Sequence, residues 1–366
     1  MRAMTLPSLF RPAALPGLDL PNRLVMAPMT RRMSPGGIPG ADVAAYYRRR
    51  AEGGVGLIIT EGTGIADPAA LAERDVPEFH GDALRGWSTV VDEVHAGGAK
   101  IFPQLWHVGS ARRPDMTNTP EVPAVSPAGL FAPGQPNGEA LDEARIGRII
   151  TAYGEAAAQA LRMGFDGIEL HFAHGYLVDQ FLWEPTNGRA DGWGRTPWLL
   201  AREVVAECRR QTNPDFPICM RFSQWKQQDY GARLFADPAC LEAFLGPMVD
   251  AGVDMFHCST RRFWEPEFAG SRMNLAGWTR RLSGKPVITV GSVGLDEDFL
   301  VTRVGDDPTA DGARLELLED MLATGEVDLV AVGRALIGDP QWSAKVREGR
   351  FDQIRTFTRD DLARLD

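Results

Sequence analysis

Residues 55–61 read VGLIITE, a short apolar run rich in β-branched side chains that leads into Gly62-Thr63-Gly64. A run of this length, bounded by glycines, is typical of a strand buried on both faces. Similar runs recur along all 366 residues. They lie at 23–29, 100–106, 167–171, 217–222, 255–259, 286–290 and 328–333.

Amphipathic stretches separate these runs, among them 42–51, 143–163, 198–210 and 241–251. Apolar strands that alternate with helices predict a parallel sheet covered by helices. Eight such units favour a closed (β/α)8 TIM barrel, although an open doubly wound sheet remains the alternative on pattern alone. We therefore predict an α/β protein with one barrel domain over residues 1–366.

Two segments fall outside this repeat. Residues 6–22 are too few for a domain, and we expect them to cap the bottom of the barrel. Residues 109–139 are rich in Pro, Gly and Ala and follow the third strand. We expect a long loop there, over the C-terminal face where such barrels carry their active sites. Pro103 cannot donate a ladder hydrogen bond, so it marks a strand start or a bulge.

The composition excludes several classes of protein. Acidic residues outnumber basic ones by 49 to 39, and the formal charge of −10 argues against binding to nucleic acid or an anionic membrane surface. No apolar run approaches the roughly 18–20 residues that span a bilayer. The cysteines lack CxxC spacing and no apolar leader opens the chain, which favours a reducing cytoplasm. They are Cys208, Cys219, Cys240 and Cys258.

Polar side chains lie at the ends of several predicted strands, which open onto one cavity in a barrel. The amide of Gln104 suits the edge of a heterocycle that carries adjacent C=O and N–H groups. Arg221, in an apolar strand, must meet a carboxylate such as Glu169 or an electron-rich ligand. Gly291 and Arg334 follow strands seven and eight, where barrels often hold phosphate; the alternative is a turn glycine and a surface ion pair. Together, the Gln104 amide, the Arg221 guanidinium and the phosphate site suggest a nucleotide-like heterocycle with a phosphate tail, a description that FMN meets.

The run His171-Phe-Ala-His174-Gly-Tyr176 follows the fourth strand. Two imidazoles three residues apart could bind zinc or iron, but no nearby cysteine or second pair completes a ligand set, and we predict no metal. Two neutral imidazoles that donate to one substrate oxygen are the more economical interpretation. Tyr176 is protonated at neutral pH and can deliver a proton. The alternative is a tyrosine at the rim of the barrel whose hydroxyl is already hydrogen-bonded.

Other residues leave alternatives open. Lys226 could form a Schiff base, although a single lysine there is usually solvated. Trp106, Phe263 and Trp264 line a substrate pocket or pack the rim. Gly62-Thr63-Gly64 lacks the third glycine of a dinucleotide-binding fingerprint, so any nicotinamide donor must share the mouth of the barrel.

Four separated segments closely resemble the old yellow enzyme family of FMN-dependent ene-reductases. They are PNRLVMAPMT (21–30), QLWH (104–107), ELHFAHGYL (169–177) and VGRA (332–335). The resemblance covers essentially the whole chain in the order of the family. It implies a TIM barrel with FMN across the strand ends, reduced by NADPH or NADH and reoxidised by an α,β-unsaturated carbonyl compound.

The resemblance also implies roles for cofactor-binding residues. Thr30 would hydrogen-bond the C4 carbonyl of the flavin, Gln104 its pyrimidine edge, and Arg221 the region of N1 and the C2 carbonyl. Gly62 would let the backbone approach the ring. The full expected set is Ala27, Pro28, Met29, Thr30, Gly62, Gln104, Arg221, Gly291, Ser292, Val293, Gly333 and Arg334.

For the substrate, the resemblance implies that His171 and His174 bind the carbonyl oxygen while a hydride leaves flavin N5 for the β-carbon. Tyr176 would protonate the α-carbon. Trp106 and Trp264 are expected to line the same substrate site. Residues 195–198, 223–230 and 261–266 depart from the family pattern, and they border the expected pocket.

The sequence thus predicts an FMN-dependent NAD(P)H oxidoreductase with an activated alkene and a nicotinamide dinucleotide as small-molecule partners. Three alternatives stay open: a TIM-barrel lyase or aldolase acting on a phosphorylated substrate, an FMN enzyme that reduces nitro compounds or nitrate esters, and a flavin-binding sensor without turnover. We expect neither a nucleic acid nor a membrane partner. Homo-oligomers occur in some members of the family and not in others, so the sequence leaves this point open.

Overall fold

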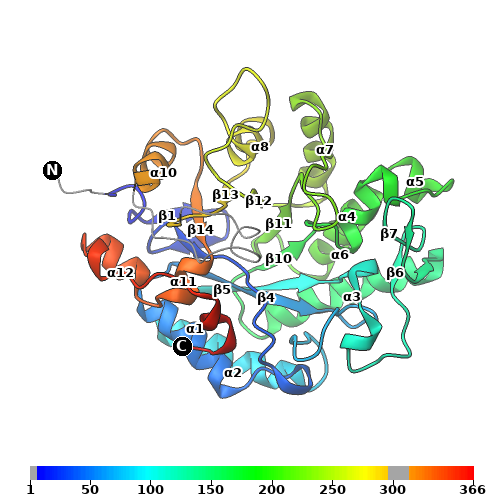
Figure 1. Ribbon diagram of the computed structural model, residues 1–366, viewed down its shortest axis with the longest axis horizontal. Coiled ribbons are helices and arrows are strands. Elements are labelled where there is room, and N and C mark those ends of the chain that lie inside the picture. The colour runs from blue at the N-terminus through cyan, green and yellow to red at the C-terminus, as the bar shows by residue number, and fades with distance from the viewer. Residues whose placement is uncertain (1–5, 296–312) are drawn as a thin grey trace.

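The computed structural model describes residues 6–295 and 313–366 (Figure 1). Eight parallel strands form a closed barrel, because the last strand pairs with the first as well as with its predecessor. The barrel strands are β3 (Leu24–Met26), β4 (Leu57–Gly64), β5 (Lys100–Trp106), β10 (Ile168–His171), β11 (Ile218–Phe222), β12 (Met255–Ser259), β13 (Val287–Val290) and β14 (Leu329–Val332). The prediction of a TIM barrel is confirmed, and the open sheet is excluded.

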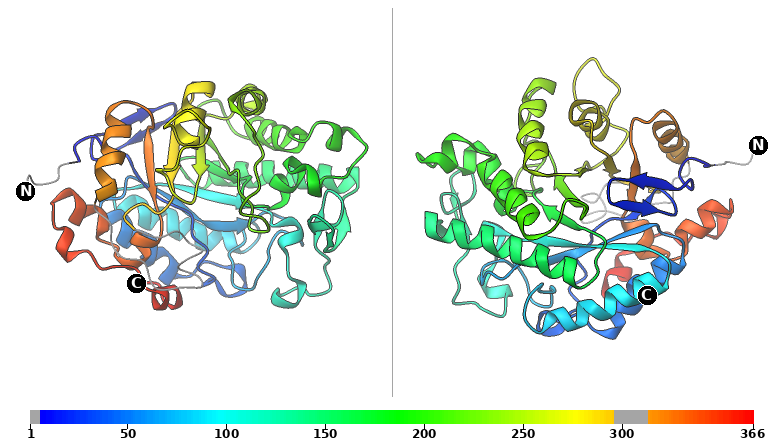
Figure 2. Two further views of the ribbon diagram at one scale, coloured as in Figure 1. Left: turned by 45° about the horizontal axis from the view of Figure 1, so that its top comes forward. Right: turned by 180° about the vertical axis from the view of Figure 1, so that it is seen from behind.

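Helices surround these strands (Figures 1 and 2). The helices that follow successive barrel strands are α1 (Ala41–Glu52), α2 (Ala83–Ala96), α3 (Glu143–Arg162), α6 (Leu199–Gln211), α7 (Pro238–Ala251), α8 (Leu275–Ser283), α10 (Ala313–Ala323) and α12 (Trp342–Arg347). Shorter helices are α4 (Leu177–Leu182), α5 (Gly192–Arg195) and α11 (Arg334–Gly338). Among the described residues, no helix combines the length and the apolar character that crossing a membrane requires.

The apolar residues of the strands divide between two clusters. Leu24 and Ile58 belong to the cluster that contains the inner faces of the helices, whereas Val25 and Leu57 belong to a separate cluster. Successive side chains of a strand point to opposite faces of the sheet. The second cluster therefore fills the inside of the barrel, which is a packed core and not a channel.

A hairpin closes the N-terminal end of the barrel. Strands β1 (Ala13–Leu15) and β2 (Leu18–Leu20) pair antiparallel, and Leu18 and Leu20 join the interior cluster. Their turn needs Gly17, since φ is 68° and a Cβ would lie 2.1 Å from the carbonyl oxygen of Asp215. The hairpin, dark blue in Figure 2, lies against the barrel strands. The predicted bottom cap is confirmed.

Pro103 marks a bulge, one of the two outcomes expected. Ile59 of β4 pairs with Phe102 of β5, but the next pair joins Gly62 to Gln104. Two residues of β4 thus lie opposite Pro103 alone, so the missing donor falls where the ladder is interrupted. The bulge places Gly62 directly beside Gln104 at the mouth of the barrel.

The long segment after the third barrel strand is more ordered than the sequence indicated. Strand β7 (Leu130–Ala132) pairs antiparallel with β8 (Gln135–Pro136), and β6 (Val125–Ser126) pairs parallel with β9 (Glu139–Ala140). Strands of two or three residues are too short to show a period-two pattern, so sequence reading missed them. In Figure 1 this excursion projects to one side of the barrel.

Candidate active site

Four predicted residues form one aromatic cluster at the C-terminal strand ends. Trp106 ends β5 and His171 ends β10, and their rings stack with centroids 5.7 Å apart and planes at 16°. The ring centroid of Tyr176 lies 4.7 Å from Trp106 and 5.0 Å from His171. The His171 and His174 rings are 5.1 Å apart and perpendicular. The structure therefore brings both imidazoles and the phenol together.

The backbone after β10 explains how two histidines three residues apart share one site. On a regular strand, positions i and i+3 face opposite sides. Here His174 and Gly175 both adopt left-handed φ angles, of 66° and 78°, which reverse the chain. A φ of 78° favours glycine at position 175, and a Cβ there would lie 1.9 Å from the side-chain oxygen of Gln228, which would have to move.

The environment sets the protonation of the cluster. Burial, followed by the positive charge of Arg221, lowers the pKa of His171 and of His174 well below the ordinary value. Burial raises the pKa of Tyr176 to about 12. At neutral pH both imidazoles are therefore uncharged and the phenol keeps its proton.

Ser259, the last residue of β12, joins the histidine cluster to the guanidinium. His174 Nε2 lies 2.8 Å from Ser259 Oγ, and Arg221 Nη2 donates to the same oxygen at 3.2 Å. The Trp225 indole donates to the Ser259 carbonyl at 3.1 Å and stacks on His174, with centroids 4.3 Å apart. We predicted no site residue on β12, the sixth barrel strand, from the sequence. The hydroxyl of Ser259 at the C-terminal end of that strand was the feature that could have indicated one.

A buried network lies within the barrel below the cluster. Gln104 Nε2 donates to Glu169 Oε1 at 2.7 Å, and His257 Nδ1 lies 2.7 Å from Glu169 Oε2. Burial alone would raise the pKa of Glu169, but His257, Arg221 and Gln104 bring it below its ordinary value. An ionised carboxylate only accepts hydrogen bonds. It therefore holds the Gln104 amide with the NH2 toward Glu169 and leaves the carbonyl oxygen for another donor.

Glu169→Gln is expected to lower the free energy of unfolding by about 3 kcal/mol at pH 7, because it leaves Arg221 without the nearby carboxylate and disrupts two buried hydrogen bonds. Chemical denaturation measures the change. The folded-state pKa of Glu169 is lowered, so the loss is full at neutral pH and shrinks as the pH falls below about 4. Glu203→Gln, which breaks an exposed pair with Arg202, is the control and should cost less than about 1 kcal/mol. An equal loss in both variants would contradict the role of Glu169.

Several buried donors at the mouth have no partner among the described residues. They include Arg221 Nε, His171 Nδ1 and Trp106 Nε1. Buried polar groups are almost always hydrogen-bonded in native proteins. The unpaired Nε of Arg221 and the available carbonyl oxygen of Gln104 fit a ring edged with carbonyl oxygens and nitrogens. The residues present therefore fit the FMN that the sequence predicts.

The turns after strands seven and eight meet, as expected for a phosphate site. Gly291 and Ser292 have φ angles of 145° and 52°. Arg334 Nη2 lies 3.5 Å from Ser292 Oγ. A Cβ on Gly333 would lie 3.4 Å from the sulfur of Met29. The segment after the first barrel strand therefore approaches these two turns. Val293 is buried beside this turn.

The segment after the first barrel strand is held by Glu61, which ends the predicted second strand but was given no role from the sequence. The Glu61 carboxylate, fully buried, accepts hydrogen bonds from the backbone N–H of Arg31 at 2.8 Å and of Arg32 at 3.2 Å. Burial raises its pKa to about 7. Ala27 N donates to Val332 O at 2.9 Å. These contacts fix both ends of the segment from Pro28 to Thr30, of which Thr30 is exposed.

Trp264 and Lys226 are not part of the aromatic cluster. Trp264 contacts Phe263, and the guanidinium of Arg314 lies 3.7 Å above its ring. Within residues 6–295 and 313–366 no ring contact joins Trp264 to the histidine cluster, so its role in substrate binding stays a prediction. Lys226 is neither solvated nor free, because it forms a fully buried ion pair with Asp179. In the described part of the chain, no group of three or more His, Cys, Asp or Glu side chains could hold a metal.

A family model described as the NADH:flavin oxidoreductase / NADH oxidase family matches residues 8–353. NADH oxidase of Thermoanaerobacter brockii is 33% identical over an alignment of 367 positions that covers 95% of this chain and 52% of the relative. The chain therefore spans about half the length of that protein. Putative 12-oxophytodienoate reductase-like protein 1 of Arabidopsis thaliana is 30% identical, over 88% of this chain and 94% of the relative. Morphinone reductase in complex with tetrahydroNAD superposes with a TM-score of 0.80 and 27% identity, covering 97% of this chain and 93% of that one.

Proposed function

Because the chain belongs to the NADH:flavin oxidoreductase / NADH oxidase family, the old yellow enzyme family that its motifs resemble, we propose that it reduces the carbon–carbon double bond of an α,β-unsaturated carbonyl compound. FMN is the cofactor of this family, and NADH or NADPH is its reductant. When bound, FMN supplies two-electron redox chemistry between the nicotinamide and the alkene. The name of the Arabidopsis relative, a 12-oxophytodienoate reductase-like protein, supports an unsaturated ketone as the class of acceptor.

The residues that would hold FMN divide between its two ends. Gln104 offers a carbonyl oxygen and Arg221 a guanidinium to the ring. Arg334 offers a charged donor to the phosphate, next to Ser292, whose hydroxyl donates to the Arg261 carbonyl at 3.0 Å. The bulge at Gly62 and the segment from Ala27 to Thr30 would border the ring between them.

One observation carries the choice of substrate class: two uncharged imidazoles and a protonated phenol share one site. Donors act most strongly where negative charge develops in the transition state. His171 and His174 would donate to the carbonyl oxygen of the substrate, and Tyr176 would hold the proton that the α-carbon takes. A lyase or aldolase that acts through Lys226 has no such support, because the ammonium group is buried in an ion pair.

Spectroscopy and turnover test this function. The purified protein, reconstituted with FMN, is expected to be yellow, and it should oxidise NADH or NADPH when 2-cyclohexenone is added under nitrogen. Gas chromatography should detect cyclohexanone in equal amount. A colourless protein whose spectrum does not change with added FMN would refute the proposal. A flavoprotein that reduces none of a panel of activated alkenes would also refute the proposal. The alternatives of a flavin-binding sensor and a nitro reductase would then remain.

A further inference from the structure

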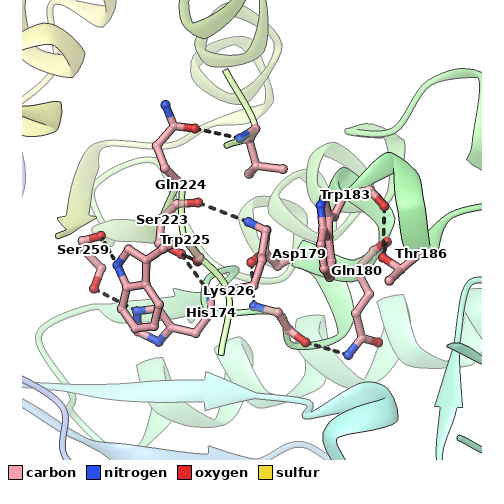
Figure 3. Close-up of polar contacts among 12 residues, drawn as sticks. His174, Asp179, Gln180, Trp183, Thr186, Ser223, Gln224, Trp225, Lys226 and Ser259 are labelled. Atoms are coloured by element: carbon pink, nitrogen blue, oxygen red, sulfur yellow. Dashed lines mark hydrogen bonds and ion pairs between the residues drawn. The ribbon is translucent and has the colours of Figure 1, made fainter. Parts of the chain in front are cut away.

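Residues 223–230, here called the 223–230 loop, pack on the turn after β10; Figure 3 shows Ser223, Trp225 and Lys226 of this loop beside His174. His174 N donates to Ser223 Oγ at 3.0 Å, and Gln227 N donates to the His174 carbonyl at 3.2 Å. His174 and Lys226 also form an isolated parallel bridge. The loop after β11 is thus joined to the turn after β10 by a single bridge and by the Ser223 hydrogen bond.

An ion pair joins the two segments from inside. Lys226 Nζ lies 2.8 Å from Asp179 Oδ1, and both side chains are 0% exposed. The other carboxylate oxygen, Oδ2, accepts a hydrogen bond from Gly175 N at 2.6 Å. Asp179 belongs to α4, so a single carboxylate links that helix, the lysine of the loop and the left-handed turn.

The cost of this arrangement argues for a function beyond packing. A buried ion pair is rarely more stabilising than apolar side chains of the same volume, because both charges lose their hydration. The turn that it holds contains a non-glycine residue, His174, in the left-handed region, which is unfavourable without support. The carboxylate holds the amide next to that residue. The ion pair therefore stabilises the turn at the point where its backbone conformation is unfavourable.

We propose that Lys226 and Asp179 are positioning residues: their ion pair holds the His174–Gly175–Tyr176 turn so that the imidazole and the phenol meet the carbonyl oxygen of the substrate. This proposal rests on the proposed function, but it concerns an oxyanion-binding geometry that can be measured without turnover. Neither residue is proposed to touch the substrate. Trp225 of the same loop stacks on His174 and adds to its orientation.

The test compares Lys226→Met with the wild type, both loaded with FMN. The probe is p-chlorophenol, whose phenolate is expected to give a long-wavelength charge-transfer band when it binds over the flavin. The variant should bind the phenol about 10- to 100-fold more weakly, because small displacements of positioned groups are costly. The KM for cyclohexenone should rise in parallel. The Kd for FMN, measured by titration of the apoprotein, should change less than about twofold, since the ring and phosphate contacts are made by other residues.

Two further variants make the result specific. Asp179→Asn combined with Lys226→Met removes both charges and keeps an oxygen for Gly175 N, so it should recover most of the phenol affinity lost in the single variant. If Lys226→Met does not fold, this double variant and Asp179→Asn alone replace it, and Asp179→Asn should show the weaker phenol binding. Lys100→Met, which breaks a partly exposed ion pair, is the control for loss of a lysine elsewhere in the barrel. Lys100 pairs with Asp166 at 2.8 Å, and Asp166 also accepts a hydrogen bond from the backbone N–H of Ile101. This pair lies at the N-terminal end of β5, at the opposite end of the barrel from the histidine cluster.

Phenol affinity within twofold of the wild type in Lys226→Met would overturn the proposal. An equal loss in Lys100→Met, or an equal loss of FMN affinity, would also overturn it, because the pair would then be a general stabiliser. If the wild type binds phenol and FMN yet reduces no alkene, the proposed function fails while the positioning test still gives its answer.

Discussion

Tyr176→Phe is expected to slow alkene reduction by about 100- to 10,000-fold, the range that a positioned general acid contributes. Reduction of the bound flavin by NADH should change little, because that step needs no proton at the α-carbon. The substitution removes only the hydroxyl and keeps the ring that contacts Trp106 and His171. With a pKa of about 12, the phenol is protonated at every pH at which the enzyme would be assayed.

Anaerobic stopped-flow measurement separates the two steps through the flavin absorbance. Tyr153→Phe is the matched control, because Tyr153 is a buried tyrosine of α3 that lies on the outer side of the barrel against Phe172. It should leave both rates unchanged. Equal slowing of both steps in Tyr176→Phe would contradict the proton-donor role and would favour a binding role for the phenol.

The double variant His171→Ala, His174→Ala is expected to lose phenol binding, seen as the absence of the charge-transfer band. Each donor to a developing oxyanion is worth about 100- to 1,000-fold in rate, so alkene reduction should fall by at least that factor. Both imidazoles are uncharged at neutral pH, and only neutral donors are removed. FMN should stay bound, since Gln104 and Arg334 are untouched.

Titration with p-chlorophenol and a stopped-flow measurement of alkene reduction test this variant. His95→Ala provides the control, because His95 lies on α2 and binds Asp166 at the other end of the barrel. A retained band in the double variant would refute the assignment of the imidazole pair, even if turnover were lost.

The fold and the aromatic cluster were accessible from the sequence for a physical reason. Strands buried on both faces read as continuous apolar runs, and the bounds of β5 and β12 coincide with the predicted 100–106 and 255–259. Once the strands are placed, their C-terminal ends must meet, which put Trp106, His171 and Tyr176 in one site.

The supporting contacts could not be predicted in the same way. His257 meets Glu169 across 88 residues of sequence, and Ser259 meets His174 across 85. Both residues lie in β12, which reads MFHCS, and only closure of the barrel decides which side chains of the neighbouring strands they meet. Lys226 was expected to be solvated or catalytic, but its partner Asp179 lies 47 residues away on a helix that the pattern did not reveal.

The hairpin of β1 and β2 has a kinetic consequence. With Leu18 and Leu20 packed into the lower barrel, the approach to the polar residues is from the opposite end. Under the proposed function, we expect nicotinamide and alkene to enter by this one end and to occupy the same space in succession, each leaving before the other arrives. Initial-rate plots at several fixed alkene concentrations should give parallel lines, and a large excess of either compound should inhibit by blocking its successor.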